Sequence, residues 1–173
     1  MRFTEPSEEY AEGIRSYRRM FLDAGDSMDG TGGLREIEDP LEWIEYSESM
    51  KDEATLPPGR VTATQYIYVR EEDGKIVGML QIRHRLNEYL EKYGGHIGYS
   101  VAPDERQKGY ASGMLKKALE KCRELGITRV LITCFETNEA SRKTILKNGG
   151  IYESTVYEPG EKKYLERYWI HLE

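Results

Sequence analysis

The stretch that decides the fold covers residues 101 to 111 and reads Val-Ala-Pro-Asp-Glu-Arg-Gln-Lys-Gly-Tyr-Ala. It follows a β-rich run at residues 96 to 102, which Pro103 ends, and it leads into residues 110 to 125, where apolar side chains recur at helical spacing before Gly126. A near-continuous apolar run at residues 128 to 135 is typical of a strand buried on both faces. The pattern therefore predicts a strand, a helix and a second strand parallel to the first.

The start of this helix has the chemistry of an anion site. A helix N-terminus presents unpaired N–H groups and the positive end of the helix dipole, which favour an anion such as pyrophosphate. Gly109 lets a phosphate approach the backbone, because a Cβ there would push the ligand off the N–H donors, and Ala111 and Ser112 keep the next turn open. Basic residues flank this loop or follow it on the helix: Arg106, Lys108, Lys116, Lys117, Lys121 and Arg123.

This loop also allows other interpretations. Gly109 could simply start the helix, with the lysines forming a solvated face. The Gly-x-x-x-x-Gly-Lys-[Ser/Thr] and Gly-x-Gly-x-x-Gly motifs are both absent, which excludes a Walker-type nucleotide site and leaves a dinucleotide fold without its fingerprint.

The rest of the chain predicts further helices and strands. In the first third we expect a helix that starts at Ser7 and ends at Gly25, and another that Asp39 caps, with Leu41 and Ile44 on its buried side. The turn at Asp73-Gly74 predicts a hairpin. The strands of that hairpin are expected at residues 62 to 70 and 75 to 85, a last helix from Asn138 to Asn148, and two final strands at residues 151 to 157 and 164 to 172.

Length and composition indicate one domain without a membrane segment. The chain has 173 residues, 38% of them hydrophobic and 32% charged, and a mean hydropathy of −0.71. No apolar run approaches the roughly 18 residues of a spanning helix, and the N-terminus lacks the apolar stretch of a signal peptide, so we expect a cytoplasmic protein with no membrane partner.

Charge and cysteine usage exclude further classes. The net charge is −6, and residues 1 to 60 hold 15 acidic against 7 basic residues, which argues against nucleic-acid binding by the whole molecule. Cys122 and Cys134 stand in no metal-ligand spacing and are expected to be free thiols in the core, so no metal is expected.

Two motifs in the second part of the chain resemble those of a known family. The residues from Arg106 to Ala111 resemble the Arg/Gln-x-x-Gly-x-Gly/Ala signature of the Gcn5-related N-acetyltransferase (GNAT) superfamily, at the expected strand-to-helix turn. Asn138 with Ser141, followed by Lys147-Asn148-Gly149-Gly150, is similar to the family's Asn-x-x-Ala/Ser and Lys-x-Gly-Phe segments. The resemblance covers roughly residues 60 to 170 in element order.

The resemblance implies a fold of the α/β class (α+β mixed). We expect a central mixed, mostly antiparallel twisted sheet of about six to seven strands, with helices on both faces. The parallel strands at residues 96 to 102 and 128 to 135 would splay apart and admit the pantetheine arm of acetyl-CoA. Residues 1 to 173 would form a single N-acetyltransferase domain, with a helical N-terminal part at 1 to 60 and a CoA-binding core at 61 to 173.

The resemblance also implies how acetyl-CoA is held. Backbone groups near the end of the first parallel strand would pair with the pantetheine amides, N–H groups of the loop would hold the pyrophosphate, and the start of the last helix would lie near the thiol. The implied cofactor-binding residues are Tyr99, Ser100, Val101, Arg106, Gln107, Lys108, Gly109, Tyr110, Ala111, Ser112, Asn138 and Ser141.

The implied reaction is attack of a neutral amine on the thioester, with a backbone N–H near Val101 polarising the carbonyl. The acceptor would be a small molecule or an exposed amino group of a peptide. The tyrosine acid of many relatives falls here on Ile145, and the glutamate base of some falls on Gly95. The candidates in their place are His96 as the base, with an ordinary packed histidine as the alternative, Glu136 acting through a water, and Tyr157.

Other functions remain open at this point. Because Ile145 and Gly95 stand where acid and base are found in relatives, the chain could be a CoA-binding or sensing module without catalysis. A transferase that uses a longer acyl-CoA is a further alternative. The strand edges at the C-terminus allow a homodimer.

Overall fold

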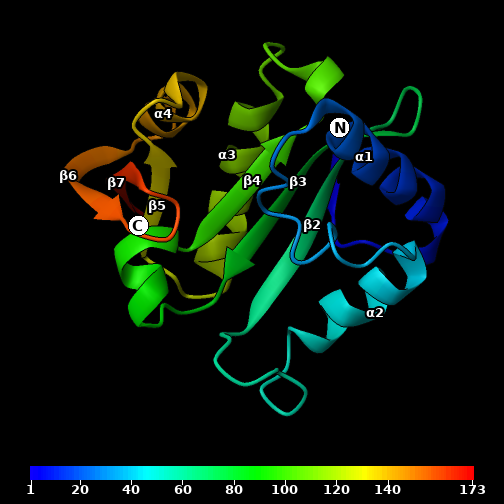
Figure 1. Cartoon of the computed structure of the whole chain (residues 1–173), viewed down its shortest axis with the longest axis horizontal. Helices are drawn as coiled ribbons and strands as arrows, with labels where there is room; N and C mark the ends of the chain where they lie inside the picture. The colour runs from blue at the N-terminus through cyan, green and yellow to red at the C-terminus, as the bar shows by residue number, and fades with distance from the viewer.

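Seven strands form two antiparallel sheets that lie side by side, and four helices cover them (Figure 1). The computed structural model describes all residues from 1 to 173. The first sheet has the order β1 (Arg2–Thr4), β2 (Ala63–Arg70), β3 (Lys75–Arg83), β4 (Ile97–Val101), and the second has the order β5 (Arg129–Phe135), β7 (Lys163–His171), β6 (Ile151–Glu158). The helices are α1 (Ala11–Ala24), α2 (Pro40–Ser49), α3 (Tyr110–Glu124) and α4 (Glu139–Lys147), with short helical segments η1 (Glu8–Tyr10), η2 (Leu90–Gly94) and η3 (Pro103–Glu105).

The two sheets meet at a fork between the neighbouring strands β4 and β5. At its apex the His96 N–H donates to the Leu131 carbonyl over 2.7 Å. Beyond this bond β4 pairs only with β3, and β5 pairs only with β7. The splayed pair of strands is thus confirmed, and because no ladder crosses the fork, the expected single sheet is divided into sheets of four and three strands.

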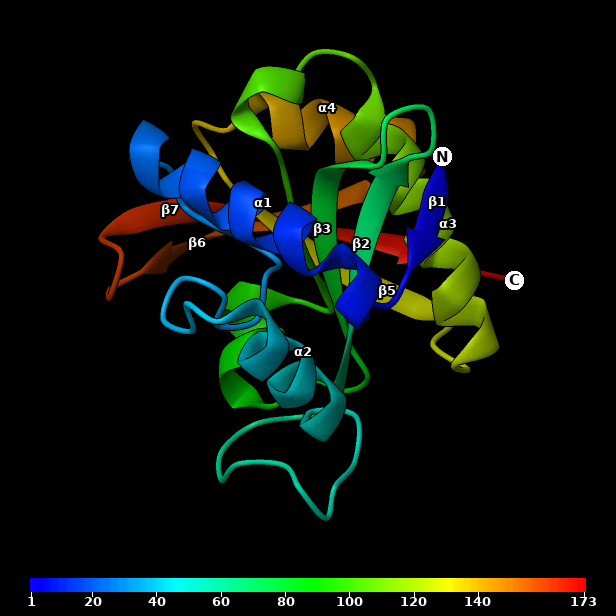
Figure 2. The ribbon, with the colours of Figure 1, turned by 90° about the vertical axis from the view of Figure 1, so that its right-hand side faces the viewer.

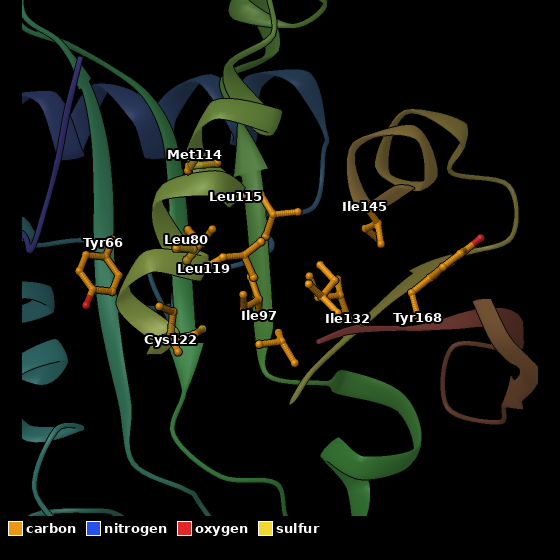
Figure 3. Packing of buried hydrophobic residues seen from close by; sticks show 14 of the residues in the cluster. Tyr66, Leu80, Ile97, Met114, Leu115, Leu119, Cys122, Ile132, Ile145 and Tyr168 are labelled. Carbon is orange, nitrogen blue, oxygen red and sulfur yellow. The ribbon is translucent and has the colours of Figure 1, made fainter. Parts of the chain in front are cut away.

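Apolar side chains fill both faces of the four-stranded sheet. On the α3 side, an 18-residue cluster takes members from both sheets, for example Leu80 of β3 and Ile132 of β5, and Ile145 of α4 joins it (Figure 3). On the other face α1 and α2 lie across β2 and β3 over an 11-residue cluster (Figure 2). The first cluster therefore holds the two sheets together at the fork.

Local signals place the start of α2 and the end of α1 where the sequence predicts them. The expected cap at Ser7 is wrong, because its side chain makes no capping hydrogen bond and α1 begins only at Ala11, after the short segment η1. Asp39 Oδ1 accepts a hydrogen bond from the Leu41 N–H over 2.9 Å at the start of α2, and Gly25 ends α1 in a left-handed conformation with φ of 67°. The prediction that Leu41 is buried is wrong, because its side chain is 49% exposed. Trp43 is fully buried in its place, and its indole N–H donates to the Thr31 carbonyl over 2.7 Å.

None of the helices combines the length and the apolar character that crossing a membrane requires.

Candidate active site

The turn between β4 and α3 carries a run of free backbone donors. The N–H groups of residues 107 to 112 make no hydrogen bond within the chain, and the 15-residue helix α3 starts directly behind them. Gln107 and Gly109 are both left-handed, with φ of 62° and 83°. Left-handed residues in such a turn direct successive N–H groups toward one point, which is the geometry of an anion-binding nest. We call residues 107 to 112 the N–H cradle.

The space in front of Gly109 is open. A Cβ placed on this residue would meet no atom of the protein within 4 Å. The protein itself therefore does not need a glycine for room here, although the left-handed φ favours one. The cradle can take a ligand group that comes close to the main chain.

The basic side chains beside the cradle are already paired. Arg106 Nη1 forms an ion pair with Asp26 over 2.9 Å, and the guanidinium lies over the Phe21 ring. Lys108 Nζ forms one with Glu105 over 3.0 Å. Both were predicted to flank the anion site, and the structure ties each of them to a carboxylate, so anion binding at this turn falls mainly to the backbone.

Glu105 gathers three cations underneath the turn. This carboxylate is only 4% exposed and accepts hydrogen bonds from Arg70 over 2.7 Å, Lys108 over 3.0 Å and Lys75 over 3.3 Å. The Arg70 guanidinium, followed by the Lys108 ammonium, lowers the pKa of Glu105 to about 2. Sequence reasoning missed this cluster, because Arg70 and Lys75 lie 35 and 30 positions away from Glu105.

A groove of about 460 Å³ continues from the cradle along α3 and the end of α4. Three basic side chains line it without an ion pair: Lys116, Arg123 and Lys147. Lys117 and Lys121 of the predicted basic patch instead pair with glutamates on their own helix. The other residues lining the groove are Ser112, Leu119, Glu120 and Asn148.

On the α4 side of the fork, hydroxyl groups connect β4 with the first turn of α4. The Tyr99 Oη and Ser141 Oγ atoms lie 2.7 Å apart, and Asn138 caps α4 by accepting from the Ser141 N–H over 3.1 Å. Burial raises the pKa of Tyr99 to about 12, so its hydroxyl stays protonated. The predicted residues Tyr99, Asn138 and Ser141 are therefore brought together at this place, whereas the Ser100 side chain points the other way and bonds Tyr17 on α1.

Cys134 lies on the same side of the fork and is buried. Burial, followed by the nearby Glu166 carboxylate, raises the pKa of its thiol to about 11. The thiol is thus a weak nucleophile at neutral pH, in line with the expected core role.

The apex of the fork is closed by His96 and Gly95. His96 is buried, and its Nδ1 accepts a hydrogen bond from the Leu131 N–H over 3.0 Å. Burial, with a smaller effect of Arg83, lowers the pKa of this imidazole to about 4. Its place between the two strands indicates that His96 positions the fork, and this low pKa makes it a weak base.

Gly95 cannot carry the glutamate that some relatives have at this point. Its φ is +67°, and a Cβ would lie 2.5 Å from the Leu131 carbonyl oxygen. Any side chain here would collide with the backbone of β5.

The other two candidate catalytic residues lie apart from this cluster. Glu136 is exposed and its carboxylate makes no hydrogen bond or ion pair, although its backbone carbonyl accepts from Arg142. Tyr157 on β6 is 47% exposed and packs edge-on against Tyr164, with ring centres 5.2 Å apart. Their catalytic roles stay predictions.

Comparisons with known proteins agree with this geometry. The family model described as the acetyltransferase (GNAT) family matches residues 33 to 149. A search of curated protein sequences gives no significant match.

Three solved structures show the similarity in fold. A ribosomal-protein-S5-alanine acetyltransferase from Vibrio fischeri is 15% identical, with a TM-score of 0.72 over 98% of this chain and 91% of that one. RimJ from Mycobacterium smegmatis, in complex with CoA-disulfide, is 18% identical, with a TM-score of 0.71 over 98% of this chain and 80% of that one. A variant of the spermidine N-acetyltransferase SpeG from Vibrio cholerae is 14% identical, with a TM-score of 0.65 over 99% and 95%.

Proposed function

The chain belongs to the acetyltransferase (GNAT) family, and we propose that it transfers the acetyl group of acetyl-CoA to a primary amine of a small molecule or to an exposed amino group, by direct attack on the thioester. It is an acetyltransferase whose acyl donor is acetyl-CoA. The observation that carries the proposal is the N–H cradle, six consecutive unpartnered donors at the start of α3 with open space in front of Gly109.

The cradle and the groove would each bind a different part of acetyl-CoA. The N–H groups of residues 107 to 112 would hold the pyrophosphate. Lys116, Arg123 and Lys147 would hold the phosphorylated nucleotide end, because they are the unpaired cations of the adjoining groove. The inner edge of β4, which has no partner strand beyond the apex, would offer backbone groups at Tyr99 and Val101 to the pantetheine amides.

The chain's own contribution to the reaction is mainly binding and orientation. A neutral amine attacks the thioester carbon, an N–H near Val101 stabilises the charge that develops on the carbonyl oxygen, and the C–S bond breaks to release the CoA thiolate. A thiol with a pKa of about 8.5 is a fair leaving group at neutral pH, so the reaction does not depend on a tyrosine at position 145. The Tyr99 and Ser141 hydroxyls, which lie 2.7 Å apart on the α4 side of the fork, would donate a hydrogen bond to this sulfur.

Calorimetry with acetyl-CoA, together with DTNB detection of released CoA over a panel of amines, tests the proposal. Gly109→Glu should abolish acetyl-CoA binding, because it places a carboxylate against the cradle. Gly126→Glu is the matched control, since Gly126 at the other end of α3 has a φ of +78° and also no atom within 4 Å of a Cβ. Retained affinity in Gly109→Glu would overturn the site. Binding without turnover would indicate a CoA-binding module, and a preference for longer acyl-CoA would change the donor.

A further inference from the structure

Arg83, the last residue of β3, is fixed at the apex of the fork. Its backbone N–H donates to the His96 carbonyl over 2.7 Å. Its side-chain Nη1 donates to the carbonyls of Gly94 and Gly95, each over 3.1 Å. Two carbonyls therefore hold the guanidinium in one orientation next to the junction of β4 and β5.

This guanidinium has no carboxylate partner. Three other partly buried arginines, Arg70, Arg142 and Arg167, each form an ion pair. No carboxylate lies within 4.0 Å of Arg83, which, like Arg18, has only backbone carbonyls as side-chain partners. Burial lowers the pKa of Arg83, and the Asp29 carboxylate only partly offsets this effect. An arginine remains charged even so, and the structure thus keeps a positive charge at the apex that no carboxylate contacts directly.

One edge of the guanidinium makes no hydrogen bond within the chain. The Nε and Nη2 atoms make no hydrogen bond. In the whole chain the only fully buried side-chain nitrogen or oxygen atoms without a partner belong to Gln65 and Arg167, so neither free atom of Arg83 is fully buried. These two N–H groups point in the same direction and match the two oxygens of a carboxylate.

The free edge lies on the face of the sheet opposite α3. Ile82 belongs to the cluster on the α3 side, and the next residue of a strand points to the other face. A Cβ on Gly98 would lie 3.3 Å from Arg83 Nη2 and 3.4 Å from the Gly30 nitrogen, which places the guanidinium beneath the loop between α1 and α2. The N–H cradle and the groove lie at α3, so the guanidinium of Arg83 lies on the other face of the sheet from them.

We propose that Arg83 binds a carboxylate of the acceptor, so that the amine substrate is an amino acid or another small amine that carries a carboxylate. The inference rests on the proposed function, because it places the acceptor opposite the CoA site. A bound carboxylate would supply the partner that this arginine lacks and would fix the amine relative to the apex of the fork.

Matched pairs of acceptors test the inference. Free L-amino acids and their carboxamides are compared by CoA release. The amine of the carboxamide is less basic and more of it is neutral, so intrinsic reactivity favours the carboxamide. We expect the intact protein to prefer the free acid in kcat/KM nevertheless. Arg83→Gln should lower kcat/KM for the free acid about 10- to 100-fold, mainly through KM, because it removes two charge-assisted hydrogen bonds.

Controls separate binding from structure. Arg83→Gln should leave kcat/KM for the carboxamide and the Kd for acetyl-CoA within about twofold. For Arg83→Lys, kcat/KM for the free acid should lie between the values of the unaltered protein and Arg83→Gln, because lysine keeps the charge but not the two parallel N–H donors of a guanidinium. The inference would be overturned if the intact protein preferred the carboxamide, or if Arg83→Gln lowered kcat/KM for the free acid and the carboxamide equally. Either result would leave the acetyltransferase proposal standing. If no amine at all releases CoA, the proposed function itself fails.

Discussion

Replacing Gly95 by alanine should damage the apex of the fork more than its small volume suggests. The new Cβ would lie 2.5 Å from the Leu131 carbonyl oxygen and 3.3 Å from the Ile132 Cα, which are backbone atoms of β5 and cannot rotate away. Relief requires β5 to move away from β4, which stretches the bond between the His96 N–H and the Leu131 carbonyl.

Two contributions set the magnitude. A non-glycine residue at the φ of 67° and ψ of −172° of Gly95, a combination that is essentially confined to glycine, costs about 1–3 kcal/mol of folding free energy. The collision with β5 adds about 1–3 kcal/mol, as overpacking of a rigid interior does. Gly126→Ala is the control for an alanine at positive φ without a collision, because Gly126 has a φ of +78° and open space around its Cβ. We therefore expect Gly95→Ala to lose about 1–3 kcal/mol more than Gly126→Ala.

Urea unfolding of the two variants beside the unaltered protein measures this difference, and calorimetry with acetyl-CoA reports whether a displaced β5 weakens binding. The reasoning requires Gly95→Ala to be the less stable variant. Equal losses in the two variants would show that β5 yields without cost and that the apex is not a rigid junction.

Further predictions concern the groove, the cradle and the apex. Lys116→Glu should weaken acetyl-CoA binding about 10- to 100-fold at low salt and less at high salt. Lys117→Glu makes the same charge change at a lysine that is already paired and should have little effect. Calorimetry at two ionic strengths tests this, and equal losses of affinity in the two variants would contradict the assignment of the groove. Gln107→Gly removes the strain of a left-handed non-glycine residue but raises the conformational entropy of the unfolded chain. Thermal unfolding should therefore show a gain of about 0–1 kcal/mol in stability. A loss of more than about 1 kcal/mol would be inconsistent with the φ of 62°. The pKa of His96 is lowered to about 4, so its contribution to stability is complete above about pH 6.5 and is lost as the pH falls toward 4. His96→Asn, whose Oδ1 can replace Nδ1 as the acceptor for the Leu131 N–H, should therefore lose less stability between pH 6.5 and 4.5 in urea unfolding. An unchanged pH profile would argue against this linkage.

Local patterns account for what the sequence could predict. The periodicity of Met114, Leu115, Ala118 and Cys122 indicates α3, and all four side chains are buried in the structure. The cradle was predictable for the same reason, since a strand end, a helix start and a glycine lie within a few residues of one another. Helix caps such as Asn138 are equally local and are confirmed.

Contacts between distant segments left no such signal. Nothing in the pattern pairs Arg70 with Glu105 or brings the Tyr99 hydroxyl to Ser141 across 42 positions. The left-handed conformation of Gln107 was equally hidden, because residues other than glycine seldom adopt it. Candidate catalytic side chains such as Glu136 could not be ranked for this reason: their value depends on neighbours that only the folded chain supplies.

The fork also affects how the protein avoids aggregation through its strand edges. A strand with one unpaired side is normally a template for aggregation, and proteins protect such strands with charges, bulges or covering segments. Here the two unpaired sides, on β4 and β5, face each other across the fork, and the cluster shared by α3 and α4 closes one side of it. The chain can thus keep backbone groups available for a small-molecule ligand without exposing them to strand pairing with another polypeptide.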